Sequence, residues 1–384
     1  MQCVFHDSIH AFNPGDWDSL CTDDYPFARH AFLAALEDSG SLGPDSGWQA
    51  HHLGVFQEGR LLLALPLYLK YHSYGEYVFD WSWASAYQQH GLDYYPKLVN
   101  AIPFTPCYGP RWLGDWEALD LQPVIDALKE ECARLGASGW HCLFPTPNLK
   151  TRLETLGASS RLGVQYHWFN HGYRQFDDFL ARVNSRKRKM IRKERRQVLE
   201  QGFKFDWREG ESITGEDWRF FYQLYQLTYA KRSGHLGYLN QGFFQQLGET
   251  LPENLLMIRA LKDDKPLAAA LFLRDASRLY GRYWGSLAEF DFLHFETCYY
   301  QGIDYALAHG LSRFDGGAQG EHKLARGFEP VETWSNHWLV HPGFQQGVRA
   351  FVREEAASVQ DYIAEARAGM SLKPLNDFTD DVAP

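Results

Sequence analysis

The chain has 384 residues, a length that suits two domains, and its 45% hydrophobic and 22% charged content is typical of a folded globular protein. Its formal net charge of −10 disfavours nucleic acid or an anionic membrane as a partner of the surface as a whole. No signal peptide, membrane-spanning run or C-x-x-C pair is visible, so we expect a soluble, cytoplasmic protein with free cysteines.

The first half begins its regular pattern at residues 53–84. These residues alternate as an apolar strand, a charged turn at 57–60, an apolar strand, a polar turn and an aromatic strand that carries Tyr77 and Trp81. A helical pattern with Tyr94 and Tyr95 follows. Further along, we expect a helix at 149–157 and, opening the second half, a strand at 165–173.

Three prolines and a glycine in residues 101–111 predict a rigid, extended loop. Such a loop can aim Arg111 at a ligand cleft, which makes Arg111 a candidate substrate-binding residue. A rigid connector without a ligand role is the alternative.

The second half repeats the strand pattern at residues 255–288, where Tyr280 and Trp284 stand 203 positions after the first aromatic pair. Helices are predicted at 215–232 and 293–310, and a final strand leads into Phe314 and Asp315. Antiparallel strands followed by a crossover helix and another strand predict a mixed sheet, as in the GNAT acyltransferase fold. We therefore expect an α/β protein with two tandem GNAT-like domains.

The expected boundaries follow from these elements. Residues 1–163 form the N-terminal domain, residues 164–341 form the C-terminal domain with the active site, and residues 342–384 form a helix and a polar tail that is expected to fray.

A dense basic run lies at residues 185–198, where Ser185 is expected to cap an exposed helix. Eight cations in eleven residues repel one another unless an anion faces them. The run therefore predicts contact with the phosphates of a carrier, such as tRNA or CoA, and a solvated helix that offsets the acidic surface is the alternative. The candidate phosphate-binding residues are Arg186, Lys187, Lys189, Arg192, Lys193 and Arg196.

The reactive side chains are most concentrated between His294 and Trp338. Amide formation requires a base for the amine and donors for the oxyanion, and the region supplies both kinds of group. Lys323, Glu296 and His294 are the candidate catalytic residues. Asp315, Gly317, His322, Arg326 and Trp284 are candidate substrate contacts; a surface ion pair between Glu321 and Lys323 is the alternative. The histidines lack metal-ligand spacing, so no metal site is expected.

Four stretches, taken together, carry a family resemblance: PFTPCYGPR, SRKRKMIRKERRQ, YWGSLAEFDFLHFETCYYQGIDYA and GAQGEHKLARGF. They resemble the FemAB-like proteins, a group of predicted N-acyltransferases or peptidoglycan biosynthesis/recognition proteins. The resemblance implies two GNAT-like domains and amide-bond formation. It also implies that Lys323, followed by Gly327 and Phe328, stabilises developing negative charge.

The resemblance and the residues together predict an N-acyltransferase that moves an acyl or aminoacyl group from aminoacyl-tRNA or acyl-CoA to an amine. The pyrophosphate loop of ordinary GNAT enzymes is missing at 285–295, which disfavours simple acetyl-CoA. No tightly bound cofactor and no membrane insertion are expected. A non-catalytic binder of a peptide or glycopeptide is the main alternative, and RNA binding through the basic helix alone is another.

Overall fold

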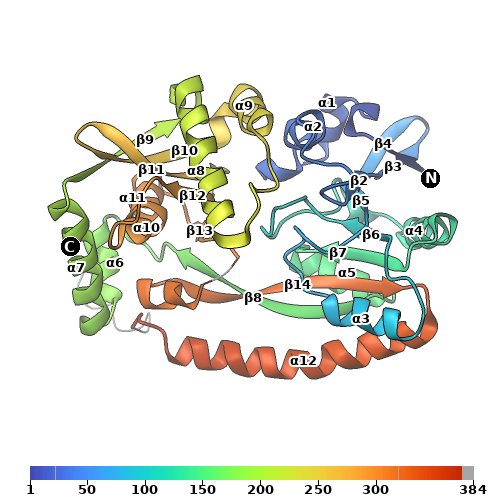
Figure 1. The fold of residues 1–384 in the computed structure, drawn as a ribbon. Helices are drawn as coiled ribbons and strands as arrows, with labels where there is room; N and C mark the ends of the chain where they lie inside the picture. The colour runs from blue at the N-terminus through green and yellow to red at the C-terminus, as the bar shows by residue number, and fades with distance from the viewer. Residues whose placement is uncertain (22, 319, 374–384) are drawn as a thin grey trace. The chain divides into compact units, whose positions relative to one another are not determined.

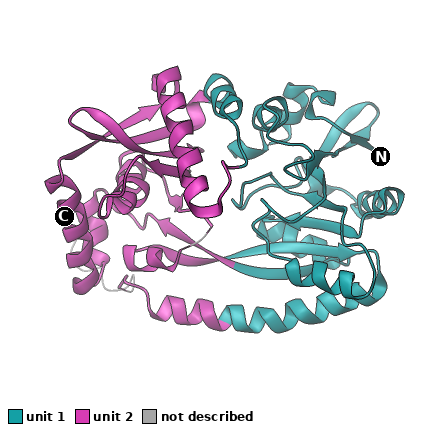
Figure 2. Ribbon diagram, viewed as in Figure 1, with its two compact units in different colours: residues 1–163, 238–251, 332–360 teal, residues 164–237, 252–331, 361–384 magenta. Residues whose placement is uncertain are grey.

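A computed structural model describes residues 1–21, 23–318 and 320–373 (Figure 1). The chain divides into two compact units, coloured in Figure 2. Unit 1 comprises residues 1–163, 238–251 and 332–360, and unit 2 comprises the remainder. Within the described part of the chain, no helix is both long enough and apolar enough to cross a membrane.

Unit 1 contains two sheets. Its strands and helices are β1 (Gln2–His6), α1 (Pro14–Ser19), α2 (His30–Asp38), β2 (Trp48–Ala50), β3 (His52–Gln57), β4 (Arg60–Leu65), β5 (Leu67–Lys70), α3 (Trp81–Gln89), β6 (Lys97–Asn100), α4 (Gln122–Leu135), β7 (Gly139–Leu143), α5 (Pro147–Thr155), the start of β8 (Ser159–Phe169), α9 (Gln241–Thr250), most of β14 (Glu329–Leu339) and most of α12 (Pro342–Ala368). Strands β1, β3 and β4 form an antiparallel sheet, and β2-β5-β6-β7-β14 are consecutive neighbours in an 11-stranded mixed sheet. Strands β6 and β7 are parallel and are joined through α4.

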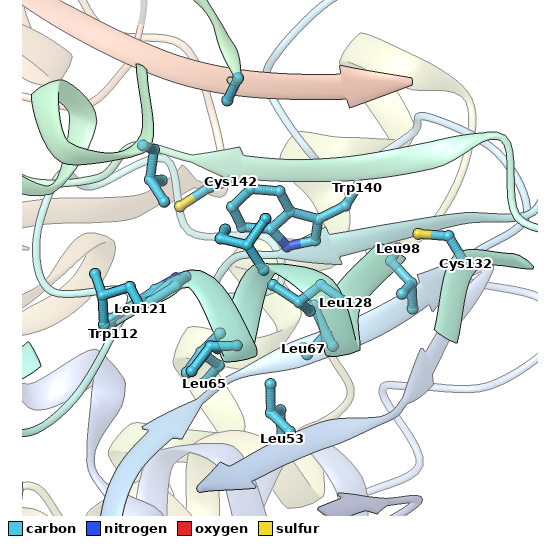
Figure 3. Packing of buried hydrophobic residues seen from close by; sticks show 14 of the residues in the cluster. Leu53, Leu65, Leu67, Leu98, Trp112, Leu121, Leu128, Cys132, Trp140 and Cys142 are labelled. Atoms are coloured by element: carbon cyan, nitrogen blue, oxygen red, sulfur yellow. The ribbon is translucent and has the colours of Figure 1, made fainter. Parts of the chain in front are cut away.

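The core of unit 1 shows why α4 forms where it does. The buried α4 residues Val124, Leu128 and Cys132 recur every four positions, which places them on one face of the helix. The helix stops at Gly136, whose φ of 63° is left-handed and suits a glycine. The buried face packs with Trp140 of β7 in the main apolar cluster of the unit (Figure 3). At this depth, truncating Leu128 to alanine should cost about 2–5 kcal/mol.

Unit 2 is built on a meander. Its elements are the rest of β8, α6 (Phe176–Arg182), α7 (Ser185–Glu200), β9 (Phe203–Glu209), α8 (Gly215–Ser233), β10 (Leu255–Lys262), β11 (Lys265–Arg274), β12 (Arg278–Ser286), α10 (Leu293–Phe295), a π-helical turn (Glu296–Tyr300), α11 (Gln301–Ala308), β13 (Arg313–Asp315), a 3₁₀ helix (Glu321–Arg326) and the start of β14. Strands β9 to β12 are antiparallel neighbours, β12 and β13 are parallel, and β13 pairs antiparallel with β8.

The second half follows the sequence prediction closely. The strand pattern at 255–288 forms β10, β11 and β12, and the expected helices form α8 and the α10–π–α11 segment. The strand into Asp315 is β13. The basic helix α7 is also present, but its cap is Asn184, whose side chain accepts a hydrogen bond from the Lys187 N–H, and not Ser185.

The first half departs from the prediction. Tyr77 has a left-handed φ of 61° and Trp81 begins helix α3, so no aromatic strand exists there. Tyr94 and Tyr95 precede β6 without a helix, and the strand expected at 165–173 is β8, which ends at Phe169. The proposed alignment at an offset of 203 is therefore wrong. Each unit nevertheless has a parallel strand pair with a crossover helix, β6–α4–β7 and β12–α11–β13.

The units are discontinuous in sequence, whereas the predicted domains were continuous. Unit 1 does end its first stretch at Gly163, but residues 332–360 belong to it because the end of β14 pairs with β7. Helix α12 belongs to unit 1 as far as Gln360 and to unit 2 from Asp361. The tail predicted to fray includes 374–384, which lie outside the described residues.

Candidate active site

The two parallel strands β12 and β13 pair over only three residues, from Arg278 opposite Arg313 to Tyr280 opposite Asp315. Beyond this point β12 continues to Ser286, while the chain after β13 turns away. A cavity of about 110 Å³ lies where the strands part. Its wall is formed by residues 270–272 and 281–284, His294, Cys298, Tyr299, Gly316 and Gly317.

A β-bulge shapes the β12 side of this cavity. On β11, Leu271 pairs with Tyr283 and Phe272 pairs with Gly281, so Arg282 is an extra residue inserted into β12. A bulge turns backbone groups and side chains away from the regular ladder, and bulges often lie beside active sites. The bulge thus lies in the cavity wall, where a ligand would contact β12.

The opposite wall depends on two glycines. Gly317 has a φ of 87°, and its N–H donates to Oδ1 of Asp315 at 2.8 Å. A side chain on Gly316 would come within 2.7 Å of the Phe328 ring. The turn therefore needs glycine at Gly317 for its conformation and at Gly316 for space.

Lys323 lies behind this turn on the 3₁₀ helix. Its side chain is 1% exposed, and Nζ donates to the Gly317 carbonyl at 2.6 Å. Burial lowers the pKa of Lys323 to about 8, although Asp315 and Cys298 oppose the shift. An ammonium group has three N–H donors, and the described residues take only one of them. The other two have no hydrogen-bond partner among the described residues, and Lys323 itself is not one of the residues that line the cavity.

Asp315 is the buried counter-charge of Lys323. Burial alone would raise its pKa, but His167, the Gly317 N–H, Lys323 and Arg282 together hold the pKa below its usual range. The nearest approach of His167 Nε2 to Oδ1 of Asp315 is 3.6 Å. Asp315 is therefore an anion that holds the glycine turn in place through the Gly317 N–H.

An aromatic group lines the helical side. His294 packs against Trp284 and Tyr299 with ring centroids 5.4 Å apart in each pair. The Tyr299 hydroxyl and Nε2 of His322 are 2.9 Å apart. Burial lowers the pKa of His294 to about 3, with help from the cationic surroundings, and the pKa of His322 is also lowered. Both imidazoles are therefore neutral at pH 7 and can accept a hydrogen bond.

Glu296, a predicted catalytic residue, is not among the residues that line the cavity. Its carboxylate accepts from Arg195 at 3.0 and 3.2 Å and from Gln301 at 2.8 Å, and Arg195 also binds Asp304 at 2.6 Å. Burial raises the pKa of Glu296, and Arg195 opposes the shift. The residue joins α7 to the helical side of the site, and we do not retain it as a base.

Arg326 is likewise held by the protein. Its guanidinium donates to both oxygens of Glu194 at 2.8 and 3.2 Å, and it lies 3.4 Å from the Phe295 ring centroid. It also donates to the His322 carbonyl at 2.9 Å. The pair is buried, so Arg326 anchors the 3₁₀ helix that carries Lys323 and is poorly placed to contact substrate.

The sequence prediction for Arg111 is not supported by its surroundings. Its side chain is fully buried in unit 1 and donates to the carbonyls of Cys107, Leu143 and Pro110 at 2.6, 2.7 and 3.1 Å. These bonds hold the proline-rich loop, as in the alternative of a rigid connector.

The basic helix α7 has two different faces. Ile191, Glu194 and Val198 are buried, and Arg195 pairs inward. On the other face lie exposed candidates for phosphate contact, which are Arg186, Lys189, Arg192, Lys193 and Arg196, while Lys187 is half-buried. Arg192 pairs with Asp177 and Arg196 with Glu200, both on the surface. Among the described residues, no carboxylate lies within ion-pair distance of Lys189 or Lys193, so this face keeps an excess of positive charge.

Sequence reasoning missed Arg282, Cys298 and Tyr299. One signal was available, because Cys298 stands four residues after His294 and the two share a helix face. The bulge at Arg282 leaves no trace in a strand pattern. The π-helical turn that brings Tyr299 to the cavity is also invisible in sequence, although such turns often mark functional sites.

Comparisons with known proteins agree with this architecture. A family model named FemAB-like, described as peptidoglycan biosynthesis/recognition, matches residues 8–374. No curated protein sequence gives a significant match. The crystal structure of FemX superposes with a TM-score of 0.56 at 14% identity, covering 91% of this chain and 100% of that one. A conserved protein of unknown function from Bacteroides thetaiotaomicron VPI-5482 gives a TM-score of 0.51 at 12% identity, covering 88% and 99% of the two chains.

A tandem GNAT protein from clavulanic acid biosynthesis gives a TM-score of 0.48 at 10% identity, covering 89% of this chain and 99% of that one. At such identities the solved structures inform the fold alone. The predicted fold class, an α/β protein with a mixed sheet, is confirmed by the strand order and the helices of the structure.

Proposed function

The chain belongs to the FemAB-like family, and from this premise we propose that unit 2 transfers an acyl or aminoacyl group from a carrier to an amine. The observation that carries the proposal is the buried ammonium of Lys323 beside the cavity where β12 and β13 part. Attack of an amine on an ester or thioester places negative charge on the carbonyl oxygen. A preorganised buried donor at that oxygen lowers the barrier substantially.

Lys323 suits this task because only one of its three donors is used within the described protein. The carbonyl oxygen of the donor group would accept one of the two remaining N–H bonds. Loss of such a donor typically costs a factor of about 10²–10³ in rate. The cation is present below its pKa of about 8, so the site is charged at neutral pH.

His294 suits the placement of the attacking amine. With a pKa of about 3, His294 can accept a hydrogen bond from the amine but retains a proton poorly. In the proposed reaction the amine nitrogen bonds to the carbonyl carbon, and the bond from that carbon to the carrier oxygen or sulfur breaks. The proton lost by the amine ends on that leaving atom, which balances the reaction without an additional cofactor.

The carrier is proposed to be a phosphate-bearing molecule, either aminoacyl-tRNA or an acyl-CoA. The supporting observation is the cationic outer face of α7, above all Lys189 and Lys193. Its inner side is tied to the site region through Arg195 and Glu296 and through Glu194 and Arg326. A peptidoglycan-precursor acceptor is suggested by the family description alone.

Thermal unfolding with and without candidate donors tests this proposal. A bound donor stabilises the folded protein by about 2.7 kcal/mol at one hundred times its dissociation constant. We expect either acyl-CoAs or aminoacyl-tRNA analogues to raise the unfolding midpoint, and the K189E/K193E variant to lose that shift. Stabilisation by a donor with no amide product from any amine would instead favour the non-catalytic binding alternative.

A further inference from the structure

A second and larger cavity lies in unit 1 and shares no residue with the proposed reaction site. Its volume is about 580 Å³, within the range typical of small-ligand sites. Its wall includes Asp7, Glu37, Gly43, Ala50 and Tyr71. Nothing in the proposed acyl transfer accounts for it.

The cavity occupies a place that a strand has left. Strand β1 pairs antiparallel with β3 as far as His6 opposite His52. Continuing that register would put Ser8 opposite Ala50. The chain departs after His6 instead, and the Ser8 hydroxyl donates to Glu37 at 2.7 Å while capping a short 3₁₀ helix. Strand β1 therefore does not fill the space beside Ala50 on this side.

Ala50 presents its backbone to that space. On the β5 side, the His51 N–H donates to the Leu67 carbonyl at 2.9 Å, and the Tyr71 N–H donates to the Gly47 carbonyl at 3.2 Å. Antiparallel bonding alternates, so Ala50 faces the other way, as Trp48 does when its carbonyl accepts from Gly43 at 3.0 Å. Within the described residues, neither the N–H nor the C=O of Ala50 has a hydrogen-bond partner. Unpaired strand groups of this kind are a template for an added peptide group.

The charges around the vacated position are acidic. Oδ1 of Asp7 is 2.7 Å from His51, whose other nitrogen is 2.6 Å from Glu131. Glu37 is held by the Ile9 N–H, Ser8 and His52. Burial would raise the pKa of Glu37, but these partners keep it below its usual range, so the residue is anionic. Among the residues that the structure describes, no lysine or arginine lines the cavity.

We propose that this cavity binds the amino terminus of a short peptide. The ammonium group is attracted by Asp7 and Glu37, and the second residue of the peptide pairs with Ala50, each N–H donating to the C=O of the other residue. The amino terminus of a peptide has a cation next to an amide. The cavity wall supplies a partner for each, because its carboxylates attract the cation and the Ala50 backbone can bond to the amides. Tyr71 and the exposed Gln49, whose side chains are hydrogen-bonded at 3.1 Å, border the remaining space for side chains.

The test uses trialanine amide and its N-acetyl form, titrated into the full-length protein at pH 6.5 and low salt. The backbone amide signal of Ala50 in nuclear magnetic resonance spectra reports binding. We expect trialanine amide to shift this signal and the acetylated peptide to bind at least tenfold more weakly. D7N should weaken binding of the free peptide about three- to tenfold, and D126N, which removes an exposed acid outside the cavity wall, should not change it.

Equal binding of the two peptides, or no shift at Ala50 with either, would overturn the proposal. So would equal affinities of D7N and D126N. If D7N fails to fold, Gln49→Lys adds a positive charge to the rim and should weaken binding by a similar factor; unchanged affinity in that variant would refute the proposed ammonium contact. Because the readout is binding to unit 1, the result does not depend on acyl transfer in unit 2.

Discussion

Replacing Glu194 with alanine tests how the lysine of the site is held. Glu194 and Arg326 form a buried ion pair with bonds of 2.8 and 3.2 Å, and the side chains are 5% and 6% exposed. The Tyr300 hydroxyl donates to the same carboxylate. Removing Glu194 leaves the Arg326 charge buried without a partner, and breaking such a pair typically costs about 3–5 kcal/mol.

For a unit of this size, each kcal/mol lowers the unfolding midpoint by roughly 2–4 °C, so E194A should lower the midpoint of unit 2 by roughly 6–20 °C. Tryptophan fluorescence during thermal and urea unfolding measures the change. The matched control is E200A on the same helix, where the surface pair of Glu200 with Arg196 should contribute less than about 1 kcal/mol.

A double variant separates the lost pair from the loss of packing. E194L/R326M replaces both charges with apolar groups of similar size and should be more stable than E194A alone. The reasoning is refuted if E194A costs no more than E200A. It is also refuted if the double variant is less stable than E194A, because the buried unpaired charge would then not explain the loss.

Three further results are expected. Burial lowers the pKa of Lys323 from 10.5 to about 8, so between these pH values the unfolded chain holds a proton that the folded chain has lost. The free energy of unfolding of the wild type, measured with urea, should therefore rise by roughly 3 kcal/mol relative to that of K323M between pH 8 and pH 10.5. A constant difference between the two proteins would contradict the pKa shift. Gly285→Ala would place a Cβ 2.3 Å from the Leu224 carbonyl, so its unfolding midpoint should fall by several degrees, whereas the exposed Gly347→Ala, in a helix, should stay level or rise. Binding of tRNA measured against salt should lose a slope of about one per phosphate contact in K189E/K193E but not in K204E/K265E, and equal slopes would remove α7 from the proposed carrier contact.

Local patterns explain which parts of the fold could be predicted. In the second half, alternating apolar residues and polar turns specify β10, β11 and β12 without help from distant residues. In the first half, the aromatic stretch at Tyr77–Trp81 looks like a strand, but Asp80 is committed to a buried cluster with Lys97 and Tyr94. Tertiary contacts of this kind override a local pattern, which explains the incorrect repeat alignment.

For the candidate site as well, the sequence predicts some features, and tertiary contacts decide the others. Lys323 stands out in sequence because it lies beside glycines and an aromatic residue, and the structure places it next to the Gly317 turn. Glu296 and Arg326 look equally reactive, but each is bound by a partner about a hundred residues or more away, Arg195 and Glu194. A sequence shows which groups are chemically capable, whereas burial and pairing decide which of them remain available to a ligand.

The most direct test of the central claim is single-turnover amide formation by the full-length protein, using the donor identified by thermal unfolding and a panel of amines. Mass spectrometry of the product compares wild type with K323Q and with K204Q, a matched change at a lysine whose side chain is 80% exposed. We predict that K323Q slows the reaction about 10²–10³-fold while its unfolding midpoint still rises with the donor, and that K204Q keeps the wild-type rate. A K323Q enzyme as fast as wild type would contradict the assignment of Lys323 as the group that stabilises the oxyanion.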